Sequence, residues 1–149
     1  MIFITVPYAG QKGLVETVKD NLAGKIVVDT VAPLALHEGR FYTLSVEEGS
    51  ASLEAQSLLP KSEIIAAFQN VSAKDLLAVP VDVHGDVVIC GDSGDAKKVV
   101  DGLVNKIPNL RPIDGGGLEN SSYVEGITAL LLNINKLYKA HSSIKVVGL

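Results

Sequence analysis

The chain has 149 residues, of which 47% are hydrophobic and 20% charged, and its formal net charge is −4. This length and composition indicate one ordinary globular domain with enough apolar side chains for a buried core. A negative net charge argues against nucleic acid or an anionic membrane as a partner, because both require a basic patch. The apolar N-terminus lacks the basic residues of a signal peptide. We therefore expect a cytoplasmic protein with no membrane partner.

The single cysteine, Cys90, follows the apolar residues Val87, Val88 and Ile89. Free cysteine in such a run is more often an inert core residue than a nucleophile. One cysteine can form no internal disulfide, which fits a reducing compartment.

The first thirty residues follow the order strand, helix, strand. Residues 1–6 form an apolar run that Pro7 ends, which is typical of a strand buried on both faces in a parallel sheet. An amphipathic helix is predicted over residues 11–23, and a second buried strand over residues 25–29. Together they predict a βαβ unit.

The middle of the chain is less regular. We expect a long loop over residues 30–49, followed by a helix over residues 50–59 with Ser50 as its N-cap. A helical turn is predicted at residues 74–79, and the sequence Asp92 to Asp95 is typical of the cap of a further helix. Three more strands are predicted, at residues 63–68, 86–90 and 110–113.

The last helix has the clearest sequence signal. Ser122 to Glu125 matches the S-x-x-E capping box, in which the glutamate reaches back to the first backbone N–H groups of its own helix. Apolar residues then recur at spacings of three and four. Leu130 and Leu137 widen this stripe beyond one packing surface, so we expect the helix to pack against its own domain and against a second subunit.

Common catalytic and phosphate-binding motifs are missing from these residues. No G-x-G-x-x-G loop occurs, and the glycine run at residues 115–117 lacks its spacing. That run is more typical of a turn, or of a place where a flat ring or another backbone comes close. His37, His84 and His141 have no metal-ligand spacing, so we expect them in turns or on the surface.

Four segments together resemble the coenzyme F420-dependent NADP oxidoreductases, where F420 is a deazaflavin. They are, in chain order, ITVPY (residues 4–8), AFQNVSA (67–73), VICGD with KKVV (88–92 and 97–100), and LRPIDGG with LENS (110–116 and 118–121). The resemblance covers essentially all of this chain and about the last two-thirds of a family member. In such proteins the glycine loop and the 2′-phosphate site come earlier. Gln69 stands where some members have a histidine.

The resemblance implies a fold and a domain division. It implies an α/β fold, with a truncated Rossmann-like, mostly parallel sheet, flanking helices and a long C-terminal helix. Residues 1–113 would form a partial dinucleotide-binding domain that lacks the first βαβ unit. Residues 114–149 would form a C-terminal helical segment.

The resemblance also implies hydride transfer between NADP(H) and F420. Because the two cofactors carry this chemistry, the protein binds and orients their rings, and we predict no catalytic side chain and no metal. The implied cofactor-binding residues are Thr5, Val6 and Pro7 beside the nicotinamide end of NADP, Gln69, Asn70, Val71, Ser72 and Ala73 around the deazaflavin, and Gly115 and Gly116 at the last glycine run.

Two other functions stay open. The chain could be a catalytically inactive binding or assembly module of the same fold, or an NADPH-dependent reductase of another flavin or a metal substrate. For the partner, we expect residues 1–6 at an open sheet edge, since no glycine-loop strand is present here to pair with them. This edge and the last helix favour a homodimer, or a complex with a separate chain that carries the glycine-loop half.

Overall fold

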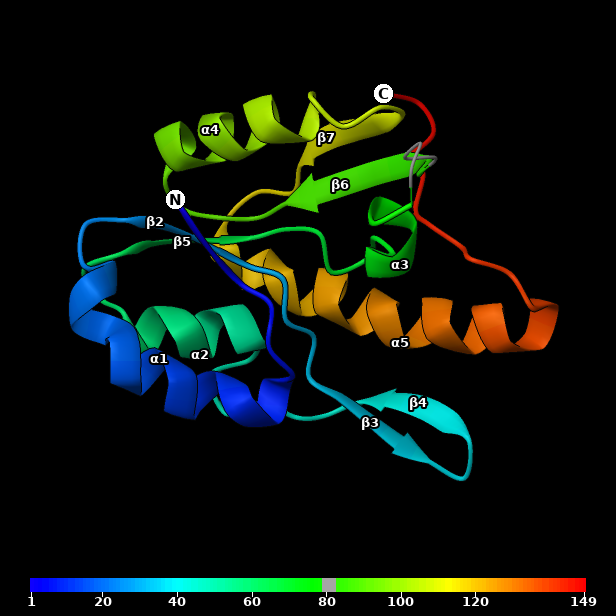
Figure 1. Cartoon of the computed structure of the whole chain (residues 1–149), viewed down its shortest axis with the longest axis horizontal. Helices are drawn as coiled ribbons and strands as arrows, with labels where there is room; N and C mark the ends of the chain where they lie inside the picture. Colours follow the sequence, from blue (N-terminus) through cyan, green and yellow to red (C-terminus); the bar gives the residue numbers. More distant parts are fainter. Residues whose placement is uncertain (79–82) are drawn as a thin grey trace.

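The computed structural model describes residues 1–78 and 83–149 (Figure 1). Its first sheet has three parallel strands in the order β1-β2-β5, namely β1 (Ile2–Ile4), β2 (Ile26–Asp29) and β5 (Glu63–Ala66). A second parallel pair contains β6 (Gly85–Ile89) and β7 (Leu110–Asp114). Ala66 and Cys90 join the two through reciprocal backbone hydrogen bonds of 2.9 and 3.0 Å. The predicted mostly parallel α/β fold is confirmed.

Helices cover both faces of the first sheet. On one face, Val27 and Ile64 share a buried cluster with α1 (Tyr8–Leu22) and α2 (Ala51–Leu58). On the other face, Val28 and Ile65 share a cluster with α4 (Gly94–Val104). Because successive strand residues point to opposite faces, a strand buried on both faces needs apolar residues in succession, as at Val27–Val28 and Ile64–Ile65.

The predicted loop over residues 30–49 is wrong, since it contains a β-hairpin of β3 (Leu34–His37) and β4 (Arg40–Thr43). Its two turn residues, Glu38 and Gly39, have φ angles of 48° and 74°. Positive φ at both positions is what a type I′ hairpin turn requires. Glutamate is unusual there, so the sequence lacks the Asn-Gly or Asp-Gly signal that predicts such a turn.

Asn133 fastens the hairpin to the last helix, α5 (Ser121–Tyr138). Its side-chain oxygen accepts from the backbone N–H of Phe41, and its nitrogen donates to the carbonyl of the same residue, both at 2.9 Å. The amide of Asn133 therefore pairs with β4 as a neighbouring strand would.

The predicted caps have mixed outcomes. Ser50, the predicted N-cap, accepts from the backbone N–H of Leu53, and Ser93, within the predicted cap sequence Asp92 to Asp95, accepts from that of Ala96, so both predictions are confirmed. The capping box at Ser122 to Glu125 is wrong: α5 begins at Ser121, its N-cap residue Asn120 makes no side-chain cap, and Glu125 binds elsewhere. The short helix α3 (Ala73–Leu76) takes the place of the predicted turn, whose last residue, Val79, lies outside the described residues.

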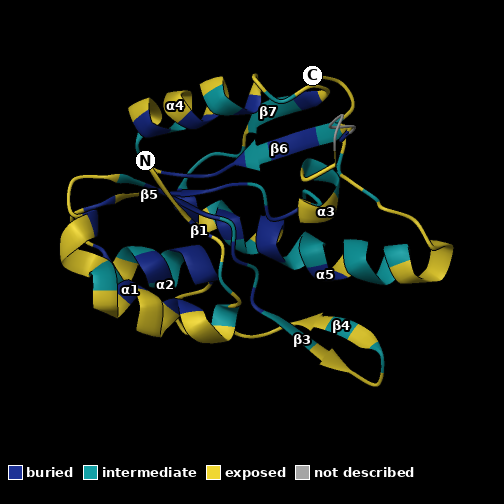
Figure 2. Cartoon of the chain, viewed as in Figure 1, coloured by how far each residue is buried: buried dark blue, intermediate teal, exposed yellow. Residues whose placement is uncertain are grey.

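β1 lies at an edge of the first sheet, as predicted. Ile2 and Phe3 are each 39% exposed, whereas Ile4 is buried in the core. Figure 2 shows that buried residues gather in the parallel strands and in the first half of α5, whereas the β3–β4 hairpin is intermediate to exposed. Among the described residues, no helix is both long and apolar enough to cross a membrane.

Candidate functional site

The three strands of the first sheet end at the same edge because they run parallel. In open α/β sheets, this carboxyl edge is where ligands bind. The loops that follow β1 and β2 are tied together, since the backbone N–H and hydroxyl of Thr30 donate to the carbonyl of Ile4 at 3.2 and 3.0 Å. The edge is therefore a built surface rather than a set of independent loops.

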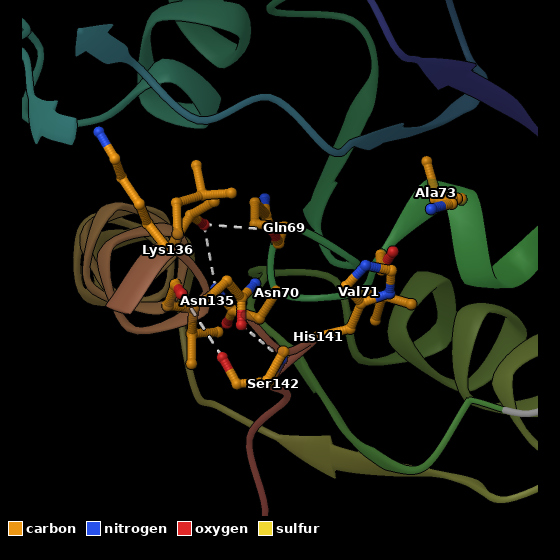
Figure 3. A pocket seen from close by; sticks show the side chains of 14 residues that line it. Gln69, Asn70, Val71, Ala73, Asn135, Lys136, His141 and Ser142 are labelled. Atoms are coloured by element: carbon orange, nitrogen blue, oxygen red, sulfur yellow. Dashed lines mark hydrogen bonds between the residues drawn. The ribbon is translucent and has the colours of Figure 1, made fainter. Parts of the chain in front are cut away.

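A cavity of about 530 Å³ lies where the chain leaves β5 (Figure 3). Phe68 has a φ of 71°, and the chain turns there from the strand into one wall of the cavity. The second wall comes from α5 and the segment after it. The lining residues are Gln69, Asn70, Val71, Ser72, Ala73 and Lys74 on the first wall, and Thr128, Leu131, Leu132, Asn135, Lys136, Ala140, His141 and Ser142 on the second.

All five residues of the predicted deazaflavin stretch, Gln69 to Ala73, line this cavity. Ser72 has a second role as N-cap of α3, because its hydroxyl accepts from the backbone N–H of Asp75. The second wall was not predicted, because Thr128 and Asn135 lie within a helix whose apolar pattern indicates packing alone. The arrangement is a cavity between a loop and a helix, lined by both apolar and polar side chains.

Two hydrogen bonds between side chains connect the two walls. At one, the side-chain nitrogen of Asn70 donates to Thr128 Oγ1 at 3.0 Å. At the other, His141 Nδ1 lies 2.7 Å from Asp75 Oδ1, and this hydrogen bond holds the pKa of Asp75 below its usual value. His141 is exposed, as predicted.

The other predicted residues lie outside this cavity. Thr5 and Pro7 are exposed after β1, where Pro7 is the N-cap of α1, and Val6 packs partly against the core. These three residues share the carboxyl edge with Gln69 but do not line the cavity.

Gly115 and Gly116 serve close packing beside β6. A Cβ at Gly115 would come within 2.6 Å of both Cys90 Sγ and Val88 Cγ1. Gly116 has a φ of 90°, and its carbonyl accepts from the backbone N–H of Gly91 at 3.1 Å. The structure thus brings these glycines against another backbone rather than into the cavity.

A buried pair of carboxyl groups lies behind the carboxyl edge and was not predicted. Glu125 accepts from the backbone N–H groups of Ala51 and Ser52, at the N-terminus of α2. Burial raises the pKa of Glu125 to about 7 and that of Asp29 to about 6, and the charge of Asp29 adds to the shift of Glu125. Asp29 also accepts from Gln11 Nε2 at 3.0 Å. The position of Asp29 at the end of a buried strand is the one sequence signal for this pair.

Cys90 is fully buried, and burial raises the pKa of its thiol to about 11. The expectation of an inert core cysteine is confirmed. Within residues 1–78 and 83–149, no group of three or more His, Cys, Asp or Glu residues is placed to hold a metal ion.

Comparison with known proteins identifies the relatives of this chain. No protein-family model matches it. It is 37% identical over 142 residues to the F420-dependent NADP reductase of Methanocaldococcus jannaschii. The matched region covers 94% of this chain and 64% of that protein. Nearly the whole chain is homologous to F420-dependent NADP reductases. The resemblance seen in the sequence is confirmed.

The fold agrees with this homology. The crystal structure of a candidate F420-dependent NADP-reductase from Arthrobacter sp. FB24 matches 99% of this chain and 69% of its own, with a TM-score of 0.85 at 20% identity. The chain spans 60–64% of the length of three curated F420-dependent NADP reductases. A shorter match, 35% identical over 113 residues, links 76% of this chain with 22% of the metalloreductase STEAP3 of Rattus norvegicus.

Proposed function

We propose that this chain forms the deazaflavin-binding part of an oxidoreductase that transfers hydride between NADP(H) and coenzyme F420. The observation that supports this most directly is the cavity at the carboxyl edge, lined by all five residues of the stretch from Gln69 to Ala73. Homology to F420-dependent NADP reductases over nearly the whole chain names the cofactors. The cavity and the homology therefore support the same proposal.

The cavity fits a flat ring. Its volume of about 530 Å³ lies within the range of small-molecule sites. Leu131, Leu132 and Val71 offer apolar contact to the ring, while Gln69 and Asn70 offer hydrogen bonds at its edge. The two cofactors supply the hydride chemistry, and the residues of this chain bind and orient the ring and keep water from it.

For NADP, we propose that Thr5, Val6 and Pro7 border the nicotinamide, since they follow β1 at the same edge as the cavity. Gly115 and Gly116 act on the site indirectly. They allow the end of β7 to lie close to β6, and this placement determines where α5 starts. The pyrophosphate needs a glycine loop at a helix N-terminus, and these 149 residues contain no such motif. Tight NADP binding therefore depends on further residues.

The domain division and the assembly belong to the same proposal. Residues 1–113 act as a partial dinucleotide-binding domain, and residues 114–149 supply the second cavity wall. One face of α5 carries aliphatic and tyrosine side chains, several of which are largely exposed. We define it as the apolar face of α5; its residues are Tyr123, Ile127, Leu130, Ile134, Leu137 and Tyr138. Tyr123, Leu130 and Leu137 are 71%, 57% and 79% exposed. This face supports a homodimer in the cytoplasm.

Titration of the purified chain tests the function. F420 and NADPH are added separately while F420 fluorescence and heat of binding are followed. We expect F420 to bind and NADPH to bind weakly. The match to STEAP3 favours a second candidate, reduction of another flavin or a metal substrate. FMN in the same titration distinguishes the two, since binding of FMN without binding of F420 contradicts the proposed function.

A further inference from the structure

Asn70 is a buried amide whose nitrogen is fully used within the protein. Its Nδ2 donates to the carbonyl of Val124 at 2.9 Å and to Thr128 Oγ1 at 3.0 Å. A backbone carbonyl can only accept, so the atom facing Val124 must be the amide nitrogen. The remaining atom, Asn70 Oδ1, is buried and has no hydrogen-bond partner among the described residues. The free capacity of Asn70 is therefore that of an acceptor alone.

Thr128, on α5, contacts the same amide and the backbone of the preceding residue, Gln69. A hydroxyl has a single proton, and that of Thr128 donates to the carbonyl of Gln69 at 3.1 Å. Toward Asn70 the hydroxyl can then only accept, so it requires the NH₂ side of the amide. One threonine thus ties two successive residues of the first cavity wall to the second wall.

Gln69 repeats the pattern. Its Nε2 donates to the carbonyl of Asp29 at 2.9 Å, which again identifies the nitrogen, and its Oε1 is buried with no partner among the described residues. Gln69 and Asn70 are adjacent, line the same cavity and are both more than nine-tenths buried. Two unpaired buried oxygens are costly, and a ligand donor would remove that cost.

We infer that Thr128 is a positioning residue: the carbonyls of Asp29 and Val124 orient the amides of Gln69 and Asn70 as hydrogen-bond acceptors, and Thr128 holds both residues against α5, so that this wall of the cavity takes a neutral ring edge with an N–H donor. This inference rests on the proposed function and deepens it. The imide of a deazaflavin ring carries such an N–H. An anionic phosphate or carboxylate does not fit there, because it would face acceptor oxygens. Since both oxygens are covered in the unliganded chain, the loop must move slightly when the ring edge enters.

A pair of ring compounds tests the inference without relying on a mutation. The probes are an 8-hydroxy-5-deazaflavin without its charged tail and the same ring methylated on the imide nitrogen, each titrated by fluorescence. We expect the parent chain to prefer the N–H ring by about tenfold or more, the scale of leaving a buried polar group unpaired. Equal affinity for the two rings overturns the inference. If neither ring binds, the proposed function itself fails.

Thr128→Val tests the positioning role. We expect it to weaken binding of the N–H ring by about tenfold and to leave the N-methyl ring little changed, so that the preference disappears. Thr128→Ser keeps the hydroxyl and should restore the preference. Thr17→Val is the matched control, because Thr17 is also a helical threonine whose hydroxyl donates to a backbone carbonyl, that of Gly13, on the exposed side of α1. A loss of affinity for both rings alike, or a preference that survives in Thr128→Val, contradicts the role of Thr128.

Discussion

Glu125 Oε2 accepts a 2.8 Å hydrogen bond from the backbone N–H of Ala51, 74 residues earlier in the chain. The carboxyl group of α5 thereby caps α2 instead of its own helix. A negative charge at a helix N-terminus is favourable. Burial opposes this charge, however, and raises the pKa of Glu125 to about 7. The position of α5, and with it the second cavity wall, depends on this contact.

The stability of the chain should fall as pH rises from about 4.5 to 7. Glu125 has a pKa of about 7 when folded against an ordinary 4.5, and Asp29 about 6 against 3.8. The folded state therefore binds protons more tightly in this window, and raising the pH removes that advantage. We expect the free energy of unfolding to drop by about 4 kcal/mol between pH 5 and pH 8, with the larger part from Glu125, as urea denaturation would measure.

Glu125→Gln should reduce this pH dependence, leaving the smaller part due to Asp29. Glu16→Gln, on the exposed side of α1, should leave the pH profile unchanged. Asp86 does not affect the stability in this pH window, because the guanidinium of Arg111 lowers the pKa of Asp86 and shifts its contribution to more acidic pH. A Glu125→Gln profile as steep as that of the parent chain would show that Glu125 is not the group responsible.

Gly115→Ala should destabilise the chain by about 1–3 kcal/mol, because the new methyl group overlaps Cys90 Sγ and Val88 Cγ1. Gly102→Ala is the matched control: it lies within α4 with open space around it, so alanine should stabilise by up to about 1 kcal/mol. Thermal melting of the two variants checks the prediction. Equal melting temperatures would mean that β7 can shift away from β6.

NADPH should bind these 149 residues weakly or not at all, because they contain no glycine loop for the pyrophosphate. Calorimetry with NADPH measures this directly, and F420 in the same buffer is the positive control. Binding of NADPH in the low micromolar range would refute the expectation and would mean that other backbone N–H groups hold the phosphates.

Leu130→Cys should form a disulfide-linked dimer under mild oxidation. Leu130 lies midway along the apolar face of α5, so an antiparallel pair of α5 helices places the two copies of this residue together at the twofold axis. Leu77→Cys is the control, since Leu77 is 83% exposed but lies at the end of α3. The buried native Cys90 should not react. Cross-linking of both variants to the same extent, or of neither, would contradict a homodimer through this face, and light scattering of the parent chain gives its mass independently.

Local sequence signals predicted the parts of the fold that depend on local chemistry. Apolar runs located β1, β2 and β5, and the hydroxyls of Ser50 and Ser93 located two helix starts. The S-x-x-E pattern at Ser122 failed for a physical reason: Glu125 finds two unpaired N–H groups on another helix, and no local pattern records that competition.

The site shows the same division. The stretch from Gln69 to Ala73 was predicted because it is continuous and follows a strand. The second wall was not predicted, because Thr128 and Asn135 are far from that stretch in sequence. Thr128 and Gln69, for example, are 59 residues apart, and only the tertiary fold brings them into contact. The buried pair of Asp29 and Glu125 is likewise created by tertiary packing.

The reciprocal bonds between Ala66 and Cys90 link the backbones of the two parallel sheets at a single residue pair in the described part of the chain. Beyond this pair the sheets meet through side chains, because Ile65 shares a buried cluster with Val87 and Ile89. The first cavity wall follows Ala66 by three residues, so a ring bound against that wall lies close in sequence to this backbone link. Amide hydrogen exchange at Ala66 and Cys90 should therefore respond to occupancy of the cavity, while the amides of β2, held on both sides, keep their protection.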